Sequence, residues 1–238
     1  MPLSSATTRI LLLGNDPADA QWSMLEYGEQ LHRALTTLSG GNPRIILRAP
    51  DSRWWIRRGR FSRAAGMYLS RYLLYPRLLR GETAGPAHIL DHGNAWLIRF
   101  LDPARTVISC HDLIPLVLQT WKKSYFPWFS ERAFREALSG LSRAARILTI
   151  SECTKKDIVE RLGCDPGRIS VAPMGIDPGF RPASSPEETA RARRTLRLPG
   201  GTLVAHVGQT ASYKNIDGIL KTLPLLDKSV QLIRAGPL

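Results

Sequence analysis

The sequence alternates short, continuously apolar runs with longer segments whose apolar residues recur at helical spacing. The run Arg9 to Leu13 predicts a buried strand, and the spacing from Met24 to Leu38 predicts a helix that ends at Gly40. Strands that are apolar throughout, with helices between them, are typical of a parallel sheet covered on both faces. We therefore predict an α/β fold with a doubly wound parallel sheet.

The same rhythm continues along most of the chain. Ser151 is the predicted cap of a further helix, and Gly163 lies just past its predicted end. Ligand sites in doubly wound sheets lie at the carboxyl ends of the strands, so we expect function in the segments after Leu13, Cys110 and Ile150. The other predicted strands of this region are 44–48, 87–90, 106–110, 147–150 and 169–172.

The composition changes after Pro173, where Pro, Gly, Ser and Arg become frequent. Ser185, Pro186 and Glu188 then predict a short, capped helix that ends near Leu196. The strand and helix rhythm restarts afterwards, with predicted strands at 203–207 and 230–234 around one helix. Two strands and one helix cannot bury a core alone, so we expect one complete domain and the opening of a second.

Composition excludes several classes of protein. Hydrophobic residues make up 43% of the 238 residues, which is enough for a core and excludes wholesale disorder. The three cysteines include no Cys-x-x-Cys pair, which argues against a disulfide framework or a cysteine-rich zinc site and favours a cytoplasmic location. We recognise no secretory signal and no run near the roughly 18 apolar residues of a membrane-spanning helix.

The charge of the chain is unusual, because 33 Lys and Arg stand against 20 Asp and Glu, a formal net charge of +13. Such a surface favours phosphates in nucleic acid, anionic lipid or a sugar nucleotide. Much of the charge is local, since 52–81 contains eight arginines, six interleaved aromatic residues and no acidic residue.

Three interpretations of this basic stretch remain open. It can be a membrane patch at the inner membrane face, a helix and loop whose charges are solvated, or a surface for single-stranded nucleic acid. The third is the least favoured, because no nucleic-acid-binding motif accompanies it. The candidate membrane patch consists of Arg53, Trp54, Trp55, Arg57, Arg58 and Arg60.

Four short motifs follow strand-like runs in a fixed order. They are Val107 to Leu113 (VISCHDL), Ile150 to Ile158 (ISECTKKDI), Val171 to Asp177 (VAPMGID), and 207–209 (VGQ) with 214–215 (KN). In this order the motifs resemble retaining glycosyltransferases of the GT-B type, group 1 (GT4-like). The resemblance covers essentially the whole chain.

The resemblance implies two Rossmann-like domains that face each other across a cleft. We predict an acceptor-side domain over 1–180, a linker with the short helix over 181–201, and the first β-α-β of a truncated, incomplete donor-binding domain over 202–238. The family's Glu-x7-Glu donor element should lie beyond Leu238, so we expect this chain to be inactive alone. A complementing C-terminal half is the partner that this expectation implies.

The implied reaction is transfer of a hexose from a nucleotide-diphosphate sugar to a glycan or lipid-linked acceptor, with retention of configuration and without a metal or other cofactor. A different class of function is a non-catalytic module that binds an acceptor or a partner chain. An in-frame continuation with the two glutamates would favour the enzyme.

The motifs also imply candidate site residues. His111 would contact the reacting sugar, and Asp112 would orient His111 or begin the next turn. Many family members carry an arginine after the motif glycine, where this chain has Gln209, so Lys214 is the main expected cation for the donor diphosphate. The candidate donor-phosphate residues are Gly208, Gln209, Lys214 and Asn215, and the candidate acceptor-binding residues are Gly14, Asn15, Asp16, Gln21, Ser23, Asp91 and His92.

Other interpretations of these residues are structural. Lys214 can be a solvated lysine at a helix start, and His111 can be a strand-end histidine satisfied by backbone groups. Ser151 and Glu152 fit a helix cap with a favourable acidic neighbour. His88, Asp91 and His92 form a pattern with metal-ligating residue types, but zinc sites need further ligands, so we favour a loop on the acceptor side.

Overall fold

The computed structural model describes residues 9–19, 21–59, 62–81, 85–118, 127–177, 179–198, 200–208 and 211–236. The chain forms two compact units, Met1–Gly175 (unit 1) and Ile176–Leu238 (unit 2). This division lies close to the predicted end of the first domain at residue 180.

Unit 1 contains a six-stranded sheet in which all strands are parallel. This confirms the predicted α/β, doubly wound fold. The strand order is β2-β1-β3-β4-β5-β6. The strands are β1 (Arg9–Leu13), β2 (Arg44–Arg48), β3 (Ala87–Ile89), β4 (Thr106–Cys110), β5 (Arg146–Thr149) and β6 (Ile169–Val171). Strands β3, β5 and β6 each end one residue earlier than predicted.

The strand order reverses direction between β1 and β3. The chain runs from β1 outward to its neighbour β2 and then returns to place β3 on the other side of β1. Loops at such a switch point diverge to opposite faces of the sheet, and the divergence leaves a crevice at the carboxyl ends of the strands. The residues that follow Leu13 and Ile89 therefore flank the position where this fold type binds ligands.

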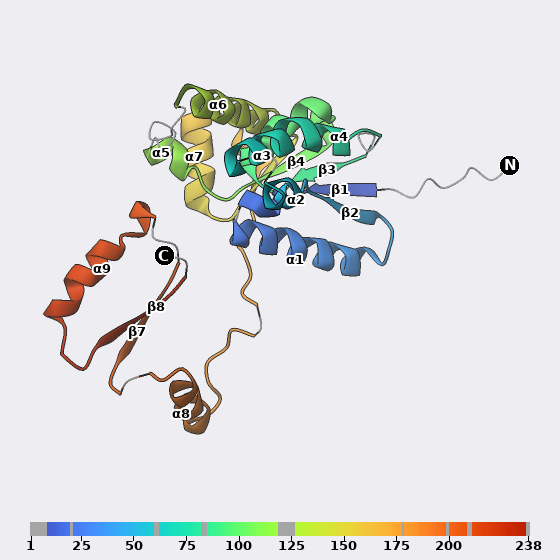
Figure 1. Cartoon of the computed structure of the whole chain (residues 1–238). Helices are drawn as coiled ribbons and strands as arrows, with labels where there is room; N and C mark the ends of the chain where they lie inside the picture. The colour runs from blue at the N-terminus through green and yellow to red at the C-terminus, as the bar shows by residue number, and fades with distance from the viewer. Residues whose placement is uncertain are drawn as a thin grey trace. The chain divides into compact units, whose positions relative to one another are not determined.

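Helices cover both faces of this sheet, with α1 on one side and α3, α4 and α6 on the other (Figure 1). Leu12 faces the α1 side with Ile45 and Leu90, while its neighbours Leu11 and Leu13 belong to the larger core on the opposite side. The helices are α1 (Trp22–Ser39), α2 (Arg53–Arg57), α3 (Arg63–Leu69), α4 (Tyr75–Leu78), α5 (Ile114–Leu118), α6 (Pro127–Arg143) and α7 (Glu152–Leu162).

Unit 1 also contains one π-helical segment and several 3-10 helices. A π-helical segment, η2 (Ser70–Leu74), joins α3 to α4, and a long 3-10 helix, η3 (His92–Phe100), follows β3. Short 3-10 turns are η1 (Pro17–Asp19), η4 (Pro103–Arg105) and η6 (Pro166–Arg168).

The predicted helix ends are confirmed. Gly40 ends α1 and Gly163 ends α7, both in the left-handed conformation with φ of 56° and 63°, which glycine adopts without the cost of a side chain. Ser151 caps α7, because its side chain accepts a hydrogen bond from the Thr154 N–H. These caps fix where α7 begins after β5 and therefore where the loop at that strand end lies.

Unit 2 contains the parallel pair β7 (Leu203–Val207) and β8 (Gln231–Ala235), drawn side by side in Figure 1. Helix α8 (Pro186–Thr195) precedes them, and α9 (Ile216–Thr222) lies between them in the chain with 3-10 turns η7 (Ser212–Lys214) and η8 (Leu223–Leu225). Strand β8 begins one residue later than predicted. Over the described part of unit 2, every residue is exposed or half-buried.

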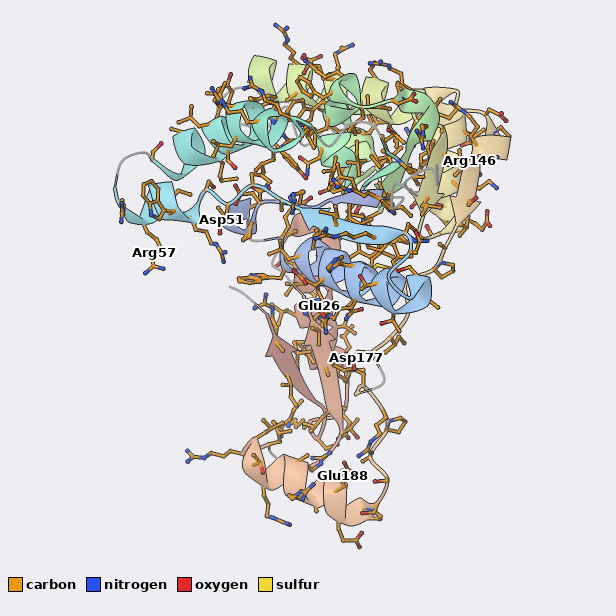
Figure 2. The ribbon with its side chains drawn as sticks, turned by 90° about the vertical axis from the view of Figure 1, so that its right-hand side faces the viewer. Glu26, Asp51, Arg57, Arg146, Asp177 and Glu188 are labelled. Atoms are coloured by element: carbon orange, nitrogen blue, oxygen red, sulfur yellow. The ribbon has the colours of Figure 1, made fainter. Side chains whose placement is uncertain are left out.

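Helix α8 shows the predicted cap. The Ser185 side chain accepts from the Glu188 N–H, and the Glu188 carboxylate accepts in return from the Ser184 N–H at 2.7 Å. Hydrogen bonds from the Ser184 side chain and backbone, and from Arg181, lower the pKa of Glu188 to about 2. Glu188 is labelled at this helix in Figure 2.

Candidate functional site

A buried hydrogen-bond network joins the loops after β1 and β3 at the switch point. The Asn15 Nδ2 donates to Asp91 Oδ2 at 2.6 Å and to Gln21 Oε1 at 2.9 Å, and Asn94 Nδ2 donates to Asn15 Oδ1 at 3.0 Å. Asn15, Asp91 and Asn94 are buried, whereas Gln21 is exposed. The structure thus brings together three predicted acceptor-side residues from separate segments and adds Asn94.

Asp91 carries the negative charge of this network. Burial by itself would raise the pKa of Asp91, but the charge of His92 and hydrogen bonds from Asn15 and the Gly93 N–H hold that pKa below its usual value. Oδ1 of Asp91 lies 2.8 Å from the Gly93 nitrogen and 3.5 Å from His92 Nδ1. Asp91 therefore stays ionised while buried at the crevice.

Asp16 anchors the loop after β1. Its carboxylate accepts from the Ala18 N–H at 2.9 Å, from the Ser52 N–H at 3.1 and 3.2 Å, and from the Ser70 hydroxyl. Asp16, Ser52 and Ser70 are all buried. The carboxylate therefore ties the loop to α2 and to the π-helical segment, and contact with an acceptor stays a prediction.

The π-helical segment and the first residue of α4 contact both switch-point loops. Arg71 donates from Nη2 to the carbonyl oxygen of Gly93, and the Tyr75 hydroxyl donates to the carbonyl oxygen of Gly14 at 2.5 Å. Single π turns are frequent at functional sites. Sequence reasoning counted Arg71 as one more surface arginine, and apolar spacing gave no signal for this role.

His111 follows β4 directly and is buried. Its Nε2 lies 2.9 Å from the carbonyl oxygen of Leu90, and because a carbonyl only accepts, Nε2 must carry the proton. Nδ1 of His111 is buried and has no hydrogen-bond partner in the described part of the chain. The ring meets the edge of the Tyr27 ring with centroids 4.8 Å apart. With Nε2 occupied, the imidazole can accept a hydrogen bond only at Nδ1.

Neighbouring groups fix the backbone around His111. The Thr154 hydroxyl of α7 donates to the His111 carbonyl oxygen at 3.2 Å. Asp112 begins the next turn, because its Oδ1 accepts from the Ile114 N–H at 3.0 Å. Of the two roles considered for Asp112, this contact is the one that the structure shows.

A second set of hydrogen-bonded polar side chains adjoins His111, because it includes Tyr27, whose ring contacts the His111 ring. The Ser109 hydroxyl lies 2.9 Å from the Tyr27 hydroxyl and 2.8 Å from Nε2 of His88. Burial, and secondarily the charge of His111, lowers the pKa of His88 from 6.5 to about 4. Burial raises the pKa of Tyr27, although the hydrogen bond with Ser109 opposes this effect. His88 is therefore neutral at physiological pH.

The metal interpretation of the His88, Asp91 and His92 pattern gains no support. Within the described ranges, no three His, Cys, Asp or Glu side chains lie close enough together to hold a metal ion.

The part of the chain that the structure describes contains no helix long and apolar enough to cross a bilayer.

The predicted donor-phosphate residues lie in unit 2. The Gly208 N–H donates to the Ala235 carbonyl oxygen at 3.0 Å as β7 ends. Lys214 is exposed, with Nζ 5.1 Å from the centroid of the Tyr213 ring. Asn215 precedes α9 in the left-handed conformation, with φ of 50°. Gln209 lies outside the described residues.

The remaining acceptor-side predictions, Gly14, Ser23 and His92, lie at the end of β1, the start of α1 and the start of η3. Gly14 is buried at the end of β1, where its N–H donates to the Arg48 carbonyl oxygen at 2.9 Å. Ser23 is exposed in the first turn of α1. His92 is half-buried at the start of η3.

The candidate membrane patch centres on α2. Arg53 forms an ion pair with Asp51 at 2.7 Å, and the Arg58 guanidinium lies 4.2 Å from the centre of the Trp54 ring, which is 45% exposed. Arg57 is exposed and projects outward from α2 (Figure 2). Arg60 and the Trp55 side chain lie outside the described residues.

Solved structures of other proteins share this fold. The described chain resembles solved structures of the Anabaena protein HepE bound to UDP-glucose or to UDP, with TM-scores of 0.61 and 0.60 at 14% identity. A glycosyltransferase from Rickettsia africae matches with a TM-score of 0.51 at 12% identity over 97% of this chain and 69% of its own. The fold is that of the GT-B glycosyltransferases.

The family follows from the sequence match. Residues 14–180 match the profile of Glycosyltransferase Family 4, and this chain belongs to that family. The chain is also 32% identical over 105 residues to a D-inositol 3-phosphate glycosyltransferase of Acidothermus cellulolyticus. That alignment includes 40% of this chain and 22% of the relative, and the match to HepE covers 95% of this chain and 60% of HepE.

Proposed function

We propose that this chain takes part in the transfer of a hexose from a nucleotide-diphosphate sugar to a glycan or lipid-linked acceptor, with retention of configuration. The buried Asn15, Asp91 and Asn94 network at the switch point, with His111 on the next strand, is the observation that carries the proposal. Membership in Glycosyltransferase Family 4 supports the reaction class, and the UDP-glucose in the HepE structure supports the donor class.

The proposed reaction separates charge. Negative charge develops on the leaving diphosphate and positive charge on the sugar, so the protein contributes mainly by positioning and by charge stabilisation. Lys214 is the proposed cation for the diphosphate, with Asn215 next to it in the sequence and Gly208 at the end of β7. The exposed ammonium of Lys214 is free of an ion pair among the described residues and can meet an anion.

His111 is proposed to bind a hydroxyl of the reacting sugar. Because Nε2 donates to the Leu90 carbonyl oxygen, the ring can accept a hydrogen bond only through Nδ1. A buried acceptor without a partner costs free energy until a donor reaches it. A sugar hydroxyl is such a donor, and Tyr27 and Thr154 keep the ring and its backbone in place.

The acceptor is proposed to meet the segment from Gly14 to Ser23 and the segment that begins at Asp91. Gln21 and Ser23 are exposed and His92 is half-buried, so their polar groups are available to acceptor hydroxyls. The Asp16 carboxylate already accepts three different donors and contributes by shaping the loop.

Nuclear magnetic resonance of the His111 ring tests the proposed sugar contact. We expect UDP-glucose to shift the His111 ring signals and UDP to shift them little, since only the sugar reaches Nδ1. His111→Gln assigns the signal, and His32→Ala, on α1 away from this network, serves as the matched control. Equal shifts with both ligands would rule out the contact, and binding of neither would contradict the proposed donor class.

We expect slow turnover by this chain alone. Over its described residues, unit 2 has no buried side chain, and a two-stranded sheet is only marginally stable without more structure. Donor hydrolysis and transfer assays with the 238-residue chain test this expectation. Robust transfer would refute it, whereas a large gain on addition of a complementing C-terminal half would support it.

A peripheral contact with an anionic membrane surface is also proposed for α2, α3 and the π-helical segment η2. Exposed Arg57 and Arg58 supply charge, and Trp54, Tyr68 and Leu73 are each at least 45% exposed. Arginines beside interfacial aromatic residues suit anionic lipid headgroups. A lipid-linked acceptor would then be reached at the same surface.

Co-sedimentation with vesicles tests this membrane contact. We expect binding to vesicles of phosphatidylglycerol at low salt, weaker binding to phosphatidylcholine, and loss of binding in Arg57→Glu with Trp54→Ala. Arg33→Glu, on the exposed side of α1, changes the net charge equally and should retain binding. Failure of both vesicle types to retain the protein would end the membrane proposal.

A further inference from the structure

Two basic side chains stand next to each other at the carboxyl end of the sheet in unit 2. His206 on β7 is the register partner of Arg234 on the parallel neighbour β8. Register partners on adjacent strands project from the same face of a sheet. Both residues are half-buried.

Both side chains converge on Gly208. Nη2 of Arg234 donates to the Gly208 carbonyl oxygen at 3.1 Å. A Cβ atom on Gly208 would lie 3.5 Å from Cε1 of His206, which places the imidazole against this glycine. Nδ1 of His206 is buried and has no hydrogen-bond partner among the described residues. The pair therefore concentrates basic groups at the point where β7 ends.

The backbone at this edge is packed closely. A side chain on Gly236, whose φ is 138°, would collide with the carbonyl oxygen of Gly208. The segments that leave β7 and β8 thus approach each other through glycine backbone alone. Close approach through glycine backbone is common where backbone meets a phosphate ligand.

We propose that Arg234, with His206 beside it, binds a phosphate group of the donor diphosphate. The inference rests on the proposed function, in which Gly208 belongs to the donor-phosphate loop. A guanidinium offers several donors in one plane and suits phosphate oxygens. The residue after Gly208 is the uncharged Gln209, so the neighbouring strand supplies the guanidinium that the loop itself lacks.

Calorimetric titration of the 238-residue chain with UDP, uridine and inorganic pyrophosphate tests this assignment. Arg234→Gln removes the charge but keeps a polar side chain with an amide donor. We expect this variant to bind UDP and pyrophosphate about tenfold or more weakly, as for the loss of a charged hydrogen bond. Its binding of uridine, which lacks phosphate, should be unchanged.

Arg146→Gln is the matched control. Arg146, labelled in Figure 2, also donates to a glycine carbonyl oxygen, that of Gly167 at 2.6 Å, but it lies in unit 1. The control lowers the net charge by the same amount and should leave UDP affinity unchanged. An equal loss in both variants would mean that overall charge causes the effect and would overturn the assignment.

Two further results separate this inference from the proposed function. Wild-type binding of UDP that Arg234→Gln leaves intact would overturn the role of Arg234 alone. Absence of UDP and pyrophosphate binding by the wild type would overturn donor binding and this role together. If Arg234→Gln unfolds, Arg234→Lys decides, because retained pyrophosphate binding supports a charge contact and lost binding in a folded protein contradicts it.

Discussion

Single carboxylates at the carboxyl edge of unit 1 hold its loops in place. Asp16 accepts from Ala18, Ser52 and Ser70, and all of these contacts are buried. Asp51, which precedes Ser52 in the sequence, forms an exposed ion pair with Arg53. The difference in burial decides how much each carboxylate contributes to the free energy of unfolding.

Asp16→Asn should lower the free energy of unfolding by about 1–3 kcal/mol, because the new amide nitrogen cannot accept and one buried donor loses its partner. Urea denaturation measures the change. Asp51→Asn, the exposed control, should have a clearly smaller effect. Equal effects of the two substitutions would show that Asp16 does not anchor the loop.

His88 makes the stability of unit 1 depend on pH. The pKa of His88 is about 4 in the folded protein, against the ordinary value of 6.5 that applies to the unfolded chain. At pH 5 His88 is therefore protonated in the unfolded chain and neutral in the folded one. Stability should therefore fall as the pH drops from about 6.5 to about 4, by about 3 kcal/mol from this group. Below that window, protonation of Asp91, whose folded pKa is lowered, removes further stability.

Urea denaturation between pH 7 and pH 4, combined with the ring signals of His88, measures this dependence. The His88 signals should not titrate between pH 7 and pH 5 in the folded protein. His88→Gln should show a flatter decrease in stability over the same range. Titration of the folded His88 near pH 6.5 would contradict the burial argument.

The packing of α6 against η3 depends on a glycine. A Cβ atom on Gly140 would collide with the carbonyl oxygen of Ala95 in η3. Because η3 begins at His92, beside Asp91, this contact also supports the loop after β3. Close packing at Gly140 thus links the large helix to the candidate site.

Gly140→Ala should destabilise the protein by about 1–3 kcal/mol, since backbone must move to admit the methyl group. Thermal unfolding measures the shift. Gly175→Ala is the control, because a Cβ atom there meets nothing within 4 Å, and it should change the melting temperature little. Comparable shifts for both variants would argue against close packing of α6 on η3.

Apolar spacing and capping signals found the strands and helices such as α1 and α7, but not every element. The stretch 63–78 forms α3, η2 and α4, although arginines and aromatic residues interrupt its apolar pattern. Its positions are set by long-range bonds, such as Tyr75 to Gly14 and Ser70 to Asp16. Spacing along the chain carries no information about such partners.

The two units differ in how they are stabilised. Unit 1 has a large buried core that includes Leu13, Ile89, Ile108 and Leu141. Unit 2 has no buried residue over its described part, and Val207 and Leu225 are more than four-fifths exposed. Burial of apolar side chains supplies most of the favourable free energy of folding, so the units should differ in local stability.

Amide hydrogen exchange should therefore be slow in β1, β3 and β4 and much faster in β7 and β8. Mass spectrometry of exchanged peptides, with both sheets in one sample, measures the contrast. We expect addition of UDP to slow exchange in β7 and β8 and to leave β1 unchanged. Equal protection of the two sheets in the free protein would contradict the difference in burial.

The sequence by itself determined the α/β class, the strands of both sheets, the caps of α7 and α8, and the ordered motifs of the family, because apolar period and capping chemistry are local properties. It also indicated Asn15, Asp91 and His111 as residues at strand ends. Only the tertiary structure decided that Asn15 bonds to Asp91, that the Leu90 carbonyl fixes the protonated nitrogen of His111, and that Arg234 reaches Gly208. These contacts depend on which strands become neighbours, and strand order follows from packing of the whole sheet and its helices rather than from any one segment.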